Sequence, residues 1–226
     1  MLAKAHSLFS YLRSKIKLSL PLLIYWAILL VLLWIFIEFA GEVYEKEGFW
    51  FDEPILGWLH RQQSPGLTRA ALTITQLGSG WFLAAASLCL LIYFWIRSRW
   101  RDLLFYALAF GGTVLLNLSI KQVLGRIRPD FFPQLSTETS YSFPSGHTMA
   151  SAGFLLSLFF LIRKYKPNYQ ILASLLGILL GLAIGLSRNY LQVHFPSDVL
   201  AGWSLTFAWI LGLNLWYSRN KVDEND

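Results

Sequence analysis

The sequence predicts an all-α integral membrane protein with six transmembrane helices, and three observations support this fold class. Hydrophobic residues make up 55% of the 226 residues, and charged residues make up only 14%, against about 25% in an average soluble domain. The mean hydropathy is +0.48. The apolar residues also fall into six blocks that are long enough, or nearly so, to cross a bilayer, which takes about 20 residues per helix. The length suits one domain, so we expect residues 1–226 to form a single unit.

The six apolar blocks predict the positions of the six spans. They cover residues 18–39, 77–96, 102–120, 147–162, 170–186 and 198–217. The fourth and fifth blocks are short for a bilayer, so we expect their helices to extend past the apolar run. The first block is too long for the apolar region of a cleaved signal peptide, and no small-x-small cleavage site follows it. We therefore interpret it as the first membrane helix.

Two connecting segments have distinct compositions. Residues 41–76 begin with acidic side chains and continue with apolar residues at helical spacing. This pattern predicts one or two short helices that lie in the membrane interface, with a plain loop as the alternative. Residues 129–143 contain two prolines and several Ser and Thr residues, which predicts an irregular loop outside the membrane.

The basic residues predict the orientation of the chain. Twelve of the nineteen Lys and Arg residues fall on one side of the predicted spans: Lys4, Arg13, Lys15, Lys17, Arg97, Arg99, Arg101, Arg163, Lys164, Lys166, Arg219 and Lys221. This side should be cytoplasmic, so both termini are expected there. The net charge of +6 is explained by these membrane flanks, and we expect no nucleic-acid partner.

The other seven Lys and Arg residues lie on the predicted outer side, where positive charge is disfavoured. Four of these seven lie near the ends of the third and fifth spans, which suggests a functional role. Lys121 and Arg128 are seven residues apart, which on a helix is two turns along one face. Pro129 would end that helix. Two cations on one face could bind a phosphate; the alternative is that they extend to the interface as long basic side chains do. Arg126 is off that face, and we expect its side chain to extend to the interface.

A second polar cluster, residues 144–147, directly precedes the fourth span. Ser145 is a good helix N-cap, and Gly146 would let an anion approach the free backbone N–H groups of the first turn. His147 would lie in that first turn, directed toward the same anion. The alternative is a capped helix with an incidental histidine.

The third cluster lies between the fifth and sixth spans. Arg188 closes the fifth span, His194 precedes the sixth, and Asp198 falls in the first turn of the sixth. Pro196 disfavours helical geometry at the residue before it, so we expect His194 in the turn just before the helix. From there, the carboxylate of Asp198 could bind one imidazole nitrogen and make the other a better nucleophile. The alternative is an ordinary hydrogen bond at a helix start.

The three clusters resemble the signature motifs K-x6-R-P, P-S-G-H and S-R-x5-H-x3-D of the type 2 phosphatidic acid phosphatase superfamily, and they match at every motif position. The resemblance implies a membrane lipid phosphatase that uses no metal or cofactor and acts through a phosphohistidine. It implies that His194 attacks phosphorus, that Asp198 orients it and that His147 protonates the leaving oxygen. The residues implied to hold the phosphate are Lys121, Arg128, Ser145, Gly146 and Arg188.

The motifs recognise the phosphate that several lipids share, so the choice of lipid stays open among phosphatidylglycerophosphate, phosphatidate, undecaprenyl diphosphate and a lipid A phosphate. A vanadate-dependent haloperoxidase uses a similar site, but the members with that activity are soluble, and this chain is not. A non-catalytic lipid-phosphate transporter or binding protein is the alternative from another class. Such a protein would need the cations but no nucleophile. The sequence makes no prediction of the oligomeric state.

Overall fold

The computed structural model describes residues 2–219, which form helices and loops with no strand among them. Six helical segments are long and apolar enough to cross a membrane: Leu20–Tyr44, Pro65–Ile96, Trp100–Leu124, Gly146–Tyr165, Pro167–Tyr190 and Pro196–Ser218. This confirms the predicted fold class, and each of the last five spans encloses its predicted block and extends past it. Residue 1 and residues 220–226 of the expected unit, with Lys221, lie outside the described residues.

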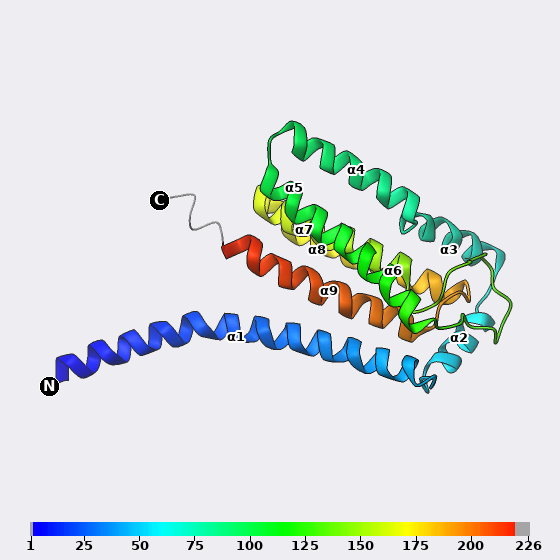
Figure 1. The fold of residues 1–226 in the computed structure, drawn as a ribbon, viewed down its shortest axis with the longest axis horizontal. Coiled ribbons are helices and arrows are strands. Elements are labelled where there is room, and N and C mark those ends of the chain that lie inside the picture. Colours follow the sequence, from blue (N-terminus) through cyan, green and yellow to red (C-terminus); the bar gives the residue numbers. More distant parts are fainter. Residues whose placement is uncertain (1, 220–226) are drawn as a thin grey trace.

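Helix α7 (Gly146–Tyr165) is the centre of the bundle. It packs against both α8 (Gln170–Tyr190) and α9 (Pro196–Arg219), and α1 (Leu2–Tyr44) lies along the other side of α9 (Figure 1). Helices α8 and α9 approach closely at Gly185, where an added Cβ would lie 2.6 Å from the ring of Trp203. A glycine at this position therefore sets how near the fifth and sixth spans can come.

The second and third spans are each built from more than one helix. Helices α3 (Pro65–Leu77) and α4 (Gly80–Ile96) share the second span, and the hydroxyl of Ser79 caps α4 by accepting the N–H of Phe82 at 3.3 Å. The third span joins α5 (Trp100–Tyr106), the π-helical η1 (Ala107–Gly111) and α6 (Gly112–Leu124). A buried apolar cluster centred on Phe105, Tyr106 and Phe160 holds this span against the rest of the bundle.

Residues 41–76, for which the sequence predicts one or two short helices, contain one complete short helix and nearly all of a second. They are α2 (Asp52–Arg61) and α3, and α3 packs against α8 and continues the second span. Their position in the membrane interface stays a prediction.

The two ends of the bundle differ in their polar residues. At the end where α5 begins, Asp102 accepts hydrogen bonds from Lys164 at 2.6 Å and from the hydroxyls of Tyr165 and Tyr217, which ties α5, α7 and α9 together. At the other end lie α2, α3 and the irregular loop 125–145, together with the end of α6, the start of α7, the end of α8 and the start of α9 (Figure 1). This topology brings all three sequence motifs to one end of the molecule.

Candidate functional site

The first motif does not lie on one helix face, so that prediction is wrong. Helix α6 ends at Leu124, and Gly125 takes the left-handed conformation with φ of 57°, which ends a helix at little steric cost for glycine. The helix therefore stops before Arg128, well ahead of the proline that we expected to end it. Lys121 and Arg128 still converge, because Lys121 Nζ lies 3.3 Å and Arg128 Nη2 lies 3.2 Å from the hydroxyl of Ser140.

Arg128 determines which ring nitrogen of neutral His194 carries the hydrogen. Its Nη1 donates to the carbonyl of Val193 at 2.6 Å and lies 3.2 Å from Nε2 of His194. A guanidinium group has donors only, so Nε2 must be the acceptor in this contact. The ring hydrogen of neutral His194 is therefore on Nδ1.

His194 lies just before α9, as predicted, and is almost completely buried at 1% exposure. Its Nδ1 is 3.2 Å from Oδ2 of Asp198, which lies in the first turn of α9. The same oxygen accepts the N–H of Phe195 at 2.9 Å and the hydroxyl of Ser142. Burial lowers the pKa of His194 to about 3, although the hydrogen bond to Asp198 acts in the opposite direction. The ring is therefore neutral at physiological pH, and its Nε2 carries a lone pair.

The second motif begins α7. Ser145 is the residue before the helix, as predicted, but its side chain makes no capping bond; its hydroxyl instead accepts from Thr148 at 2.9 Å. An added Cβ on Gly146 would lie 3.2 Å from Oδ1 of Asn117 and 3.9 Å from Cε of Lys121. Glycine therefore keeps the first turn of α7 close to the Lys121 side chain.

His147 lies in that first turn and is half-buried. Its electrostatic neighbours are three cations, Arg188, Arg128 and Lys121, and one carboxylate, Glu138. His147 and His194 therefore have two cationic neighbours in common, Arg128 and Arg188.

Arg188 lies in the last turn of α8, as predicted, and is buried at 1% exposure. Its Nη1 donates to the hydroxyl of Thr75 at 2.7 Å, and its Nη2 pairs with Glu138. Its Nε has no hydrogen-bond partner within the part of the chain that the structure describes. Buried donors normally have partners, so this Nε is available to a ligand.

Arg126 does not extend to the interface, so our interpretation of this residue is wrong. Its side chain is only 11% exposed, and its Nη1 lies 2.6 Å from Oδ1 of Asp198 while its Nη2 lies 3.0 Å from Oδ2 of Asp52. Its guanidinium carbon is also 3.9 Å from the ring centroid of Phe195. The end of α6 at Leu124 redirects the chain, which turns Arg126 inward.

Sequence reasoning also missed the role of an acidic residue on α2. Both oxygens of Asp52 accept from Ser197, the N–H at 2.9 Å and the hydroxyl at 2.6 Å, so the carboxylate lies at the N-terminus of α9. Burial raises the pKa of Asp52, and hydrogen bonds from Ser197 and Arg126 oppose that rise. In the sequence Asp52 is one of five acidic residues between 42 and 53, and nothing there distinguishes it from the others.

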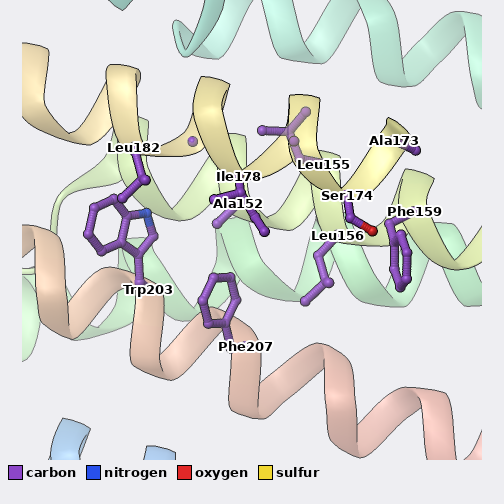
Figure 2. Close-up of a pocket in the computed structure, with 12 residues that line it drawn as sticks. Ala152, Leu155, Leu156, Phe159, Ala173, Ser174, Ile178, Leu182, Trp203 and Phe207 are labelled. Carbon is purple, nitrogen blue, oxygen red and sulfur yellow. The ribbon is translucent and has the colours of Figure 1, made fainter. Parts of the chain in front are cut away.

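An apolar pocket of 370 Å³ lies elsewhere, between α7, α8 and α9. Figure 2 shows Trp203 and Phe207 of α9 facing α7 and α8 across it. Its lining residues Ala152 and Trp203 come five residues after His147 and Asp198, which is roughly 7–8 Å further along each helix. The pocket therefore lies within the apolar part of the bundle, apart from the polar cluster.

All eight predicted site residues meet at one end of the bundle. Three cations surround a half-buried histidine and a neutral histidine whose second nitrogen is held by a carboxylate. Among residues 20–218, whose side chains the structure describes, no group of three His, Cys, Asp or Glu side chains could hold a metal ion. Arginine and lysine clusters suit a phosphate group, and an oriented neutral imidazole suits nucleophilic attack. These features define a helical membrane protein with a cluster of cations, two histidines and a carboxylate at one end of its bundle.

Comparison with known proteins agrees with this class. The PAP2 superfamily matches residues 102–221. The phosphatidylglycerophosphatase B of Bacillus subtilis is 38% identical over 172 residues, which cover 72% of this chain and 78% of that protein. An undecaprenyl-diphosphatase of Sulfolobus acidocaldarius is 27% identical over 84% of this chain and 89% of its own length. The crystal structure of the transmembrane PAP2-type phosphatidylglycerolphosphate phosphatase from Bacillus subtilis matches with a TM-score of 0.75 and 29% identity, over 84% of this chain and 96% of that one. The chain belongs to the PAP2 superfamily and is a membrane lipid phosphatase.

Proposed function

We propose that this phosphatase hydrolyses a lipid phosphate monoester or diphosphate through a phosphohistidine formed on His194. One observation carries the proposal. The unprotonated Nε2 of His194 lies 3.2 Å from Arg128 on the side of the cations, while Nδ1 is held 3.2 Å from Asp198. This is the arrangement of a nucleophile that is oriented by a third group.

In the first step, the lone pair on Nε2 forms a bond to phosphorus, and the bond from phosphorus to the leaving oxygen breaks. His147, which is protonated once the negative charge of the bound phosphate offsets the three cations, gives its proton to that oxygen, so the lipid alcohol leaves neutral. The imidazole of His194 becomes positively charged as the bond forms, and the carboxylate of Asp198 stabilises that charge through Nδ1–H. Lys121, Arg128 and Arg188 stabilise the negative charge on the equatorial oxygens.

In the second step, water attacks the phosphohistidine and orthophosphate leaves. His147, now neutral, accepts a proton from the water, and the electron pair of the phosphorus–nitrogen bond returns to Nε2. Both histidines are then in their starting states. The three cations supply the positive charge that a metal ion supplies in other phosphoryl-transfer sites, so we propose that the reaction is independent of metal.

The substrate is a lipid because the candidate site lies at the ends of the spans, where a headgroup can reach it while the acyl chains stay in the bilayer. The 38% identical relative is a phosphatidylglycerophosphatase B, which supports phosphatidylglycerophosphate as the first candidate. Undecaprenyl diphosphate follows, since a relative that is 27% identical is an undecaprenyl-diphosphatase.

Orthophosphate release from a panel of lipids tests this function. Purified protein is presented with phosphatidylglycerophosphate, phosphatidate, undecaprenyl diphosphate and a lipid A phosphate in mixed micelles, with glycerol phosphate as the soluble comparison. We expect kcat/KM to be highest for one of the lipids and lowest for the soluble ester. Failure to hydrolyse any of them, with binding retained, would favour a non-catalytic binding protein or transporter.

We also propose that the site faces the outer side of the membrane. The connections rich in Arg and Lys, residues 97–101 and 163–166, lie at the end of the bundle opposite the site, and such connections are usually cytoplasmic. Accessibility of terminal tags in intact cells tests this orientation. A tag that is reachable from outside would overturn it.

A further inference from the structure

The carboxylate of Glu138 lies between two of the three cations proposed to hold the phosphate. It comes from the irregular loop 125–145, pairs with Nη2 of Arg188, and lies 3.7 Å from Nη2 of Arg128. Burial by itself raises the pKa of Glu138, but the charges of Arg188 and other neighbours outweigh this and hold the pKa below its usual value. The side chain is therefore an anion at neutral pH.

Glu138 also blocks part of the arginine edge that would bind a phosphate. Nε and one Nη of an arginine form a planar pair of donors that can bind two phosphate oxygens at once. In Arg188, Nη2 is taken by Glu138, while the buried Nε has no hydrogen-bond partner among the described residues. Nη2 carries two hydrogens, so a phosphate bound to Nε and Nη2 would lie directly beside the Glu138 carboxylate. The two anions would repel each other unless Glu138 moves away.

The loop allows that movement without disturbing the rest of the site. The backbone is tied down on either side of Glu138, by the N–H of Leu135 to the carbonyl of Leu191 at 3.0 Å and by the N–H of Ser142 to the carbonyl of Arg126 at 2.8 Å. Thr137 and Thr139 beside Glu138 are exposed. The Glu138 side chain can therefore turn toward solvent while both anchors stay in place.

We propose that Glu138 is an internal anion that occupies the phosphate-binding arginines in the resting enzyme and is displaced by the incoming phosphate group. This inference rests on the proposed function only for the identity of the phosphate site. A phosphate that binds Arg188 and Arg128 competes with Glu138 for both arginines. Glu138 therefore weakens the binding of substrate and of the orthophosphate product alike, and its return to the arginines helps the product to leave.

The test compares Glu138→Gln, which keeps the size of the side chain and removes its charge, with Asp130→Asn, which removes an exposed charge from the same loop. KM for the lipid phosphate and the inhibition constant of orthophosphate are measured at fixed ionic strength. We expect both constants to fall together in Glu138→Gln by about tenfold, the factor that corresponds to 1.4 kcal/mol. Asp130→Asn should leave both constants within about twofold, as expected for a screened surface charge.

The direction of the change separates this proposal from a structural role. If Glu138 only holds the two arginines in place, Glu138→Gln raises KM and the inhibition constant or leaves them unchanged, and the proposal is wrong. The proposal would also be wrong if KM and the inhibition constant fell equally in Asp130→Asn. Tighter phosphate binding would then follow from the net charge of the loop, whichever acidic residue is changed. If Glu138→Gln does not fold, Glu138→Asp serves instead. Its shorter side chain weakens the arginine contacts, so both constants should fall, by less than for Glu138→Gln.

A binding measurement distinguishes failure of this proposal from failure of the proposed function. Orthophosphate affinity is measured by calorimetry in His194→Ala, with and without Glu138→Gln, so that no turnover is needed. Tighter phosphate binding in the double variant supports the internal anion even if no lipid in the panel is hydrolysed. Unchanged or weaker binding overturns it even if hydrolysis is established.

Discussion

Arg126 and Asp198 form a buried ion pair, with Nη1 2.6 Å from Oδ1. The other oxygen of Asp198 binds His194, so one carboxylate connects the arginine to the proposed nucleophile. The second nitrogen of Arg126 reaches Asp52 on α2 at 3.0 Å. The orientation of the histidine thus depends on a chain of contacts that starts outside the three motifs.

We predict that Arg126→Gln lowers kcat by about 10- to 100-fold, the usual effect of removing a group that orients a functional ligand. KM should stay within about twofold, because Arg126 does not belong to the set proposed to hold the phosphate. Arg126→Lys should be intermediate, since an ammonium group cannot bridge two carboxylates as a guanidinium does. Steady-state kinetics of these variants, with exposed Arg61→Gln as the control, test this.

Loss of folding would be a trivial cause of low activity in Arg126→Gln, because the substitution leaves two buried carboxylates without their cation. The double variant Arg126→Gln, Asp52→Asn removes one of those charges and should recover thermal stability but not kcat. A variant with normal kcat and a raised KM would contradict a positioning role for Arg126.

The buried neutral state of His194 predicts how stability changes with pH. Its pKa is about 3 in the folded protein and about 6.5 in an unfolded chain. Between these values the unfolded state binds the extra proton, so stability rises with pH across this window and is lost as the pH falls. From pH 6.5 to pH 5 the loss due to this one group should be roughly 1.5 kcal/mol.

Thermal unfolding of wild type and His194→Gln in phosphate-free detergent solution tests this dependence, since bound phosphate would itself stabilise the fold. The wild-type Tm should fall more steeply than the variant Tm as the pH is lowered from 6.5 to 5. Parallel curves would mean that His194 is not buried in its neutral form.

Two glycines one turn apart on α8 provide a matched test of the packing. An added Cβ on Gly185 would lie 2.6 Å from Trp203 and 2.9 Å from Val199, whereas on Gly181 it would lie 3.9 Å from Leu155. Gly185→Ala should therefore destabilise the protein by about 1–3 kcal/mol through overpacking, while Gly181→Ala should not lower Tm. Equal Tm values for the two variants would show that α8 and α9 are not in close contact there.

We predict that turnover survives strong chelation, because three side-chain cations supply the charge that the transferred phosphoryl group needs. Activity after dialysis against excess EDTA should equal the untreated activity within error. Loss of turnover that added magnesium restores would disprove metal independence.

The fold and most of the candidate site could be predicted from the sequence, because both depend on local signals. Hydropathy alone indicates the six spans, and the spacing of His194, Pro196 and Asp198 predicts the turn that joins the histidine to the carboxylate. The remaining contacts depend on tertiary structure. Gly125 takes the left-handed conformation and turns Arg126 inward. The loop 125–145 brings Glu138 back to Arg188. Neither feature leaves a periodic pattern in the sequence.

The covalent phosphoenzyme is the most direct test of the central claim. Rapid-quench measurements with a radiolabelled lipid phosphate should trap a base-stable, acid-labile label on His194 in the wild type and none in His194→Ala. His147→Ala should still form the label, but with the lipid substrate about 10²–10⁴-fold more slowly, the usual contribution of a proton transfer. With an activated aryl phosphate, whose phenolate leaves without a proton, His147→Ala should slow this step much less. A phosphoenzyme in His194→Ala, or an equal loss with both substrates in His147→Ala, would contradict the roles assigned to the two histidines.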